Sequence, residues 1–293
     1  MKYWKQITAL TLFSCFAHGQ SLTYKVIKDT PDDFANYWVN VGLFDMGFAT
    51  ENPGYGLLGA SLNTVVHYKN KFGGEITYRK YYISLAENED KGTQFEIGGF
   101  YNLFSKQKSK NQKVILSQKS NGKSTTTVSM KVPATIQRAF GVRAGFNSLT
   151  EGLDADSTIH GVQGSFTSKS AGLYAGVLMT TSVNVKSHTS EYGIKGAGFV
   201  RRNYLDILFN PINPLFVGDV KYTGNAKLGA LGFRLGIEFL KAEPKKVQGS
   251  AIYQKFEIGS RPIDGYYAMY SLGFNFKRKV KSMSSFVVVR EKE

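Results

Sequence analysis

The chain has few of the residues on which disulfides, metal sites and membrane helices depend. Its 293 residues include one cysteine, Cys15, four histidines and seven prolines. After the N-terminal segment the histidines form no close pair, so the ligand spacing of a zinc site is absent. The glycines are scattered at strand spacing and form no nucleotide-binding loop, and we expect no metal and no cofactor. Beyond the N-terminal segment, no apolar run reaches the roughly 18 residues of a membrane helix.

The residues that are abundant favour β-structure. The chain has 31 glycines, 17 tyrosines and 21 phenylalanines. Aromatic side chains favour strands, and the few prolines seldom interrupt them. The formal net charge of +15 makes the chain basic. Because the basic residues do not gather on one element with stacking aromatics, we predict no nucleic-acid partner.

The N-terminus has the three-part layout of a secretory signal peptide. The segment "MKYWKQITALTLFSCFAHGQ" begins with two lysines, continues through an apolar stretch and ends in small residues. Cleavage after Gly19 would remove Cys15, and the mature chain would then have no disulfide and no thiol chemistry. The stretch "LFSC" also loosely resembles a lipoprotein cleavage box, although Phe13 is bulky where that box has a small residue.

An alternation with a period of two residues predicts strands along the rest of the chain. In "LGFRLGIEF", residues 231–239, large apolar residues fall on one face, while glycine, arginine and glutamate fall on the other. As a helix, this stretch and its flank would carry three glycines, each costing about 1 kcal/mol. The alternation predicts twelve strands, at residues 37–48, 56–69, 74–86, 93–104, 111–119, 124–133, 136–148, 170–185, 197–209, 226–240, 250–259 and 265–277.

The pair that flanks "SNGK", residues 111–119 and 124–133, has a second interpretation. It could be a hairpin that projects from a ten-stranded wall. We therefore expect an all-β fold of about 12 strands, within a range of 10 to 14.

Two architectures fit alternating antiparallel strands in an exported chain. A soluble barrel or sandwich buries its apolar face and exposes its polar face, whereas a transmembrane barrel turns the apolar face toward lipid. The predicted strands are mostly as long as the 9–11 residues of a membrane strand. Their second face carries small residues and single charges, as a confined lumen requires. A sheet in lipid must also close, because an open edge leaves backbone groups unpaired. These features favour a closed antiparallel up-and-down transmembrane β-barrel over a soluble barrel that binds an apolar ligand.

The start at Gln20, the Tyr- and Gly-rich strands and the basic character resemble the outer-membrane β-barrel proteins of Gram-negative bacteria, in particular those of the Bacteroidetes group. The resemblance is one of pattern and implies location in the cell outer membrane, with outer-membrane lipid and other envelope proteins as partners. It divides the chain into a signal peptide (1–19), a periplasmic segment (20–36), a barrel (37–278) and a basic tail or additional strand (279–293). Such barrels often end in an aromatic residue. The candidate here is Phe276, and "SSFVVV" in the tail is the candidate additional strand.

The charged residues of the polar face are the candidate functional residues. They have two interpretations: an ion-pair network that fills the lumen, or a narrow passage in which an excess of cations favours small anionic solutes. The residues expected to line the lumen are Glu75, Arg79, Glu96, Arg143, Arg202, Asp206, Arg234, Glu238, Lys255 and Glu257.

One weak feature points to catalysis. In "KSHTSEYG", His188 and Ser190 lie two residues apart, which resembles the His-x-Ser arrangement of outer-membrane phospholipase A and lipid A deacylases. The resemblance implies His188 as base and Ser190 as nucleophile, but Glu191 stands where those enzymes usually carry asparagine. A polar turn is the simpler explanation of the segment. We therefore expect a structural or accessory barrel or a passive pore, and not an enzyme, with a lipid-modifying serine hydrolase as the alternative.

Overall fold

The computed structural model describes residues 23–31, 37–50, 57–68, 71–83, 92–153, 166–217, 220–221, 229–242, 251–262 and 265–278. The predicted signal peptide, the tail after residue 278 and its segment "SSFVVV" lie outside the described residues. None of the described residues belongs to a helix with the length and hydropathy needed to cross a membrane.

Thirteen strands make up most of the described chain. They are β1 (Tyr24–Asp29), β2 (Tyr37–Ala49), β3 (Leu57–Tyr68), β4 (Phe72–Ile83), β5 (Thr93–Ser120), β6 (Thr125–Leu153), β7 (Phe166–Thr189), β8 (Gly193–Ile212), β9 (Leu215–Val217), β10 (Val220–Lys221), β11 (Leu231–Ala242), β12 (Ala251–Arg261) and β13 (Gly265–Arg278).

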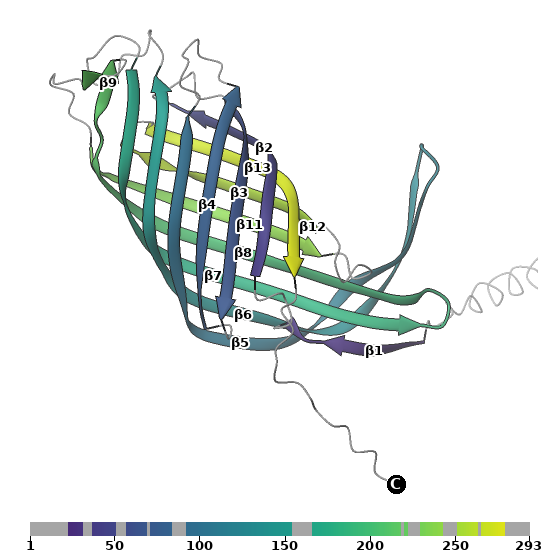
Figure 1. Ribbon diagram of the computed structural model, residues 1–293. Helices are drawn as coiled ribbons and strands as arrows, with labels where there is room; N and C mark the ends of the chain where they lie inside the picture. Colours follow the sequence, from purple (N-terminus) through teal and green to yellow (C-terminus); the bar gives the residue numbers. More distant parts are fainter. Residues whose placement is uncertain are drawn as a thin grey trace, which may run out of the picture.

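Ten of these strands close into an antiparallel barrel (Figure 1). Hydrogen-bonded neighbours follow the order β7-β6-β5-β4-β3-β2-β13-β12-β11-β8, and β8 pairs back with β7. The predicted all-β fold with a closed antiparallel up-and-down barrel is thereby confirmed. Residues 111–119 and 124–133, which were counted as separate strands, are continuations of β5 and β6. The structure therefore has the alternative arrangement, a hairpin projecting from a ten-stranded wall.

Three short strands lie outside the wall. β1, from the segment expected to precede the barrel, pairs with the end of β7. β9 pairs with the start of β7 and with β10, in a stretch between the predicted strands 197–209 and 226–240. We call the end of the barrel where β2 begins and β13 ends the terminal end, and the opposite end the loop end.

The wall strands have the length of membrane strands. β3 and β4 contain 12 residues each. At about 3.3 Å per residue and a tilt of about 40°, such a strand rises about 30 Å along the barrel axis, the thickness of a hydrocarbon core.

The wall has its apolar face outside and its polar face inside. On β11, Leu231 is 70% exposed, while Arg234 and Glu238 are 1% and 2% exposed. The same alternation runs round all ten strands, each of which exposes large apolar side chains. One from each strand illustrates this outer belt: Phe48, Leu62, Ile76, Ile97, Val142, Leu173, Leu205, Leu235, Phe256 and Phe274.

Past the terminal end, outward-facing apolar residues are buried instead of exposed. β5 and β6 continue past the wall as a hairpin, and Figure 1 shows it curling to the side of the barrel. It covers the outward face of β7 and β8 where these strands also project. The buried apolar residues at this contact form a small apolar core, which we call the terminal-end core: Val114, Leu116, Val132, Ala134, Ile136, Val183 and Val185.

A local contact fixes the point at which the hairpin leaves the wall. β6 pairs with β7 only as far as Ile136 opposite Val183, and β1 then takes its place beside β7. The Asp29 carboxylate of β1 accepts hydrogen bonds from the Thr135 backbone N–H at 2.8 Å and from the Thr135 hydroxyl at 2.7 Å. At the hairpin tip, Gly122 adopts a φ of 83°, a left-handed conformation that glycine favours.

Candidate functional site

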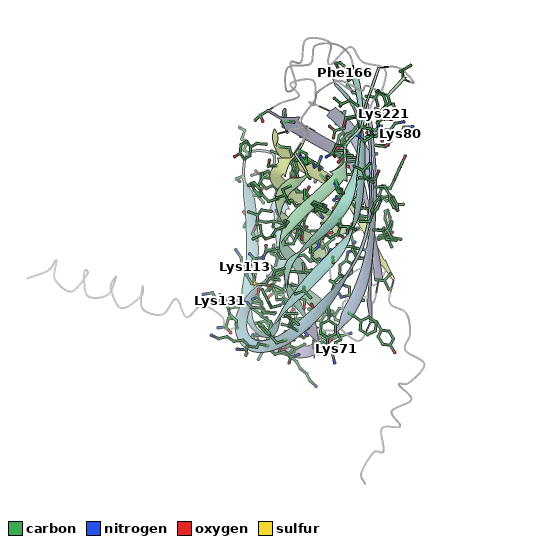
Figure 2. The ribbon with its side chains drawn as sticks, turned by 90° about the vertical axis from the view of Figure 1, so that its left-hand side faces the viewer. Lys71, Lys80, Lys113, Lys131, Phe166 and Lys221 are labelled. Carbon is green, nitrogen blue, oxygen red and sulfur yellow. The ribbon has the colours of Figure 1, made fainter. Side chains whose placement is uncertain are left out.

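The inward positions of the wall bring together all ten charged residues that were expected to line the lumen. Each of them is buried. They come from six strands, namely β4, β5, β6, β8, β11 and β12. Figure 2 shows side chains projecting into the space that these strands enclose. The interior is therefore the part of the molecule where most of the charge and hydrogen bonding gathers.

Glu75 of β4 anchors a bridge across the lumen. Its Oε2 lies 2.7 Å from Nη2 of Arg202 on β8, and its Oε1 contacts Nη2 of Arg143 on β6. Three wall strands separate β4 from β8 on one side and five on the other, so the pair joins nearly opposite parts of the wall. Arg202 also reaches Glu238 of β11, with Nη1 2.8 Å from Oε2.

Arg234 of β11 makes a second bridge. Its Nε lies 2.7 Å from Oδ2 of Asp206 on the adjacent β8, and its Nη1 contacts Oε1 of Glu96 on β5, nearly opposite. Nε of Arg143 lies 3.5 Å from Oδ1 of Asp206 and so joins the two bridges. The result is a chain of alternating charges through the lumen, in the order Glu238, Arg202, Glu75, Arg143, Asp206, Arg234 and Glu96.

The network extends from this chain toward the loop end. Oε2 of Glu257 lies 3.9 Å from Nη1 of Arg234, which joins Glu257 to the chain. Glu257 also lies 3.4 Å from Nζ of Lys255 and 3.7 Å from Nη2 of Arg261. Gln94 extends the network from Glu96, the last member of the chain. Its amide nitrogen donates to Glu96 at 2.6 Å, and its amide oxygen accepts from Arg79. Nε of Arg79 in turn donates to Oδ2 of Asp45 at 3.1 Å. All ten predicted residues therefore belong to one connected network.

Tyrosine rings fill the space between the arginines. The Arg143 guanidinium carbon lies 4.2 Å from the ring centroid of Tyr204, and the Arg234 guanidinium carbon lies 4.6 Å from that of Tyr174. These distances are those of cation–π contacts. A Cβ at Gly236 would lie 2.1 Å from Cζ of Tyr204, so only glycine leaves room for this ring. Gly73, Gly145 and Gly259 likewise lie against aromatic side chains of neighbouring strands, namely Phe100, Tyr174 and Tyr267.

A ladder of amides lines the lumen nearer the terminal end. Asn40 of β2 donates to Asn63 of β3 at 2.8 Å and to Glu238 at 3.1 Å. Asn63 donates to the Thr77 hydroxyl of β4 at 2.7 Å, and Asn275 of β13 donates to Asn40. Four consecutive strands are thereby joined by side chains as well as by backbone hydrogen bonds.

The charges of the interior nearly balance. The buried cationic side chains of the described residues are Arg79, Arg143, Arg202, Arg234, Lys255 and Arg261, and the buried carboxylates are Asp45, Glu75, Glu96, Glu151, Asp206, Glu238 and Glu257. Six cations thus face seven carboxylates. The excess of cations on which an anion preference would depend is absent from this part of the chain.

The sequence analysis missed three charged members of this interior, Asp45, Glu151 and Arg261. A register shift between Gly42 and Asp45 reverses the alternation in β2. The two adjacent apolar residues Leu43 and Phe44, both exposed, are the sequence signal of that irregularity. Glu151 and Arg261 lie at strand ends beyond the predicted strands 136–148 and 250–259.

A cavity of about 10 Å³ near the loop end is lined in part by Glu96, Arg234 and Arg261. A cavity of this size holds about one water molecule.

His188 and Ser190 lie away from the lumen. His188 is exposed on β7, opposite Lys25 of β1 and Ile194 of β8, and Ser190 is exposed in the turn that follows. In the described part of the chain, no hydrogen bond joins the two side chains and no carboxylate orients His188. The two residues thus lie at an exposed hairpin tip, and no third group among the described residues completes a catalytic triad with them.

No known family model matches the chain, and no curated protein matches it in sequence.

Proposed function

We propose that this protein is an integral outer-membrane barrel with a closed lumen, which serves the envelope as a structural or accessory component through its two ends. The observation that carries the proposal is the combination of an apolar belt on all ten strands with ion pairs that cross the interior. Soluble monomers rarely expose contiguous apolar patches of more than a few hundred Å². A belt that surrounds the molecule favours lipid as its environment.

The distribution of aromatic residues supports the same environment. Toward the terminal end the outward face carries Tyr68, Phe72 and Tyr101, and toward the loop end it carries Phe48 and Tyr266. Transmembrane barrels have such aromatic girdles at both interfaces. The belt between them has the height estimated above for the wall strands.

The crossed ion pairs favour a closed barrel over a passive pore. A bridge between β4 and β8 and another between β5 and β11 occupy the middle of the lumen with side chains. Small barrels commonly have interiors just filled in this way. A solute would have to break several buried ion pairs to pass. The serine hydrolase is not part of the proposal, because no carboxylate of the described residues orients His188.

A planar-bilayer recording tests this function. We expect the refolded full chain to float with lipid vesicles, and to remain electrically silent after it inserts into a planar bilayer. Discrete current steps from the unmodified protein would show an open pore. Failure to float with vesicles would show that the belt does not face lipid.

A further inference from the structure

The β5–β6 hairpin has an unusual charge content. Between Phe104 and Phe140 it contains eight cationic residues and no carboxylate, so this one segment carries more than half of the net charge of +15. All eight side chains are exposed. They are Lys106, Lys108, Lys110, Lys113, Lys119, Lys123, Lys131 and Arg138. Within the described residues, none of them forms an ion pair.

The register places like charges directly opposite each other. Lys106 pairs with Arg138 across the hairpin, and Lys113 pairs with Lys131. Directly opposite like charges destabilise a strand pair. Lysines also protect free strand edges from pairing with other chains. That role explains lysines on an edge, but it does not explain cations facing cations with no carboxylate between them. The described residues supply no carboxylate to these cations, and we therefore expect a partner molecule to supply the negative charge.

The cations begin where the apolar belt ends. The outward rings of Phe104 and Phe140 stack with centroids 5.3 Å apart. Lys106 and Arg138 form the next pair on the same face, about 7 Å further along the strands. Nearby, Nζ of Lys71 lies 5.8 Å from the ring centroid of Tyr101. Aromatic rings followed by lysines and arginines are typical of the depth at which lipid headgroups lie.

The hairpin is held beside the barrel. The terminal-end core joins it to β7 and β8, and Asp29 binds Thr135 at its base. In Figure 1 it curls to the side instead of continuing along the barrel axis. Lys71, Lys113 and Lys131 all lie toward the terminal end in Figure 2. The cations are therefore kept close to the level at which the belt ends.

We propose that the β5–β6 hairpin is an electrostatic arm that binds the phosphate groups of anionic lipids in the leaflet at the terminal end. Basic segments beside a membrane gain free energy from anionic headgroups, and the gain is screened by salt. This inference rests on the proposed membrane location. An acidic protein is the competing partner, but its binding would not require the cations to begin directly beside the aromatic pair.

A fluorescent label at the hairpin tip tests the proposal. The full chain carries Cys15→Ser and Ser120→Cys, and a thiol-reactive fluorophore is attached at position 120. The protein is inserted into phosphatidylcholine vesicles, with or without about one quarter phosphatidylglycerol. Both vesicles contain a lipid with a quencher on its headgroup. We expect stronger quenching in the anionic vesicles, and loss of the difference when salt is added.

Two further variants identify the groups responsible. Replacing Lys106, Lys108, Lys110 and Arg138 by glutamine removes four of the eight cations and should weaken the dependence on anionic lipid by about half or more. A control variant replaces Lys80 and Lys221 by glutamine; both are exposed and lie toward the loop end (Figure 2), and the dependence should persist.

The outcomes separate this inference from the proposed function. If the protein floats with both kinds of vesicle and the label is quenched equally in both, the hairpin does not bind anionic lipid. The proposed membrane location would be unaffected by that result. Failure to float with either vesicle would overturn the membrane barrel itself. A label that responds to added polyglutamate but not to phosphatidylglycerol would also overturn the arm and indicate an acidic protein as partner.

Discussion

Replacing Arg202 by methionine is expected to lower the free energy of unfolding by about 3–5 kcal/mol, because it leaves buried carboxylates without their partner. Arg202 joins Glu75 and Glu238 across the lumen. The same change at Arg201, its exposed neighbour on β8, is expected to stay within about 0.5 kcal/mol. Urea unfolding of the barrel folded into lipid vesicles measures both.

A double variant tests the mechanism of this loss. If Arg202 acts through its carboxylate partners, Glu238→Gln should offset part of the cost of Arg202→Met, so that the double variant loses less than the sum of the two single changes. Strict additivity, or equal losses at Arg201 and Arg202, would show that the ion pairs do not stabilise the interior.

Replacing Glu75, Arg143 and Arg202 together by serine is expected to turn a silent barrel into a channel. These three side chains form the bridge between β4, β6 and β8. Their removal takes long side chains out of the middle of the lumen and leaves water in their place. Planar-bilayer recording should then show discrete current steps. The variant must first float with vesicles, so that a folding failure is not mistaken for a closed lumen.

The ion selectivity of that channel provides a second readout. Six buried carboxylates and four buried cations remain among the described residues after the change. Because charge in a narrow lumen sets selectivity, the reversal potential should indicate a preference for cations. Replacing Lys106, Lys108 and Lys110 by serine, which removes three charges outside the lumen, should leave the barrel silent. If the triple variant floats with vesicles but carries no current, the bridge formed by Glu75, Arg143 and Arg202 is not what closes the lumen.

The architecture could be predicted because the alternation along each strand is local. In β11, glycine, arginine and glutamate alternate with leucine, phenylalanine and isoleucine, and the structure places these two sets on opposite faces. The same two-residue alternation predicted the ten charged residues of the lumen. The strand count was harder, because β5 and β6 keep a strand pattern well beyond the wall. No local feature of the polar stretch before Val114 marks the residue at which β5 leaves the barrel wall.

The pairing inside the lumen could not be predicted. Which carboxylate meets Arg202 depends on how many strands close the barrel and how far each is shifted against the next. A single irregularity before Asp45 was enough to reverse the face of that residue. Tyr174 and Tyr204 were on the polar face of their strands, but their contact with Arg143 depends on neighbouring strands that lie far away in sequence. The fold of the hairpin back onto β7 and β8 is likewise a tertiary contact.

Spin labels on β3 test the central claim, a lipid-facing wall around a closed lumen, most directly. In a Cys15→Ser chain, cysteines replace outward Leu62 and Val66 in turn, and inward Ser61 and Val65 in turn. In lipid vesicles, labels at the outward sites should be accessible to oxygen and protected from a water-soluble nickel complex. Labels at the inward sites should be protected from both. Access of the nickel complex to the inward sites would contradict the closed lumen, and its access to the outward sites would contradict the membrane location.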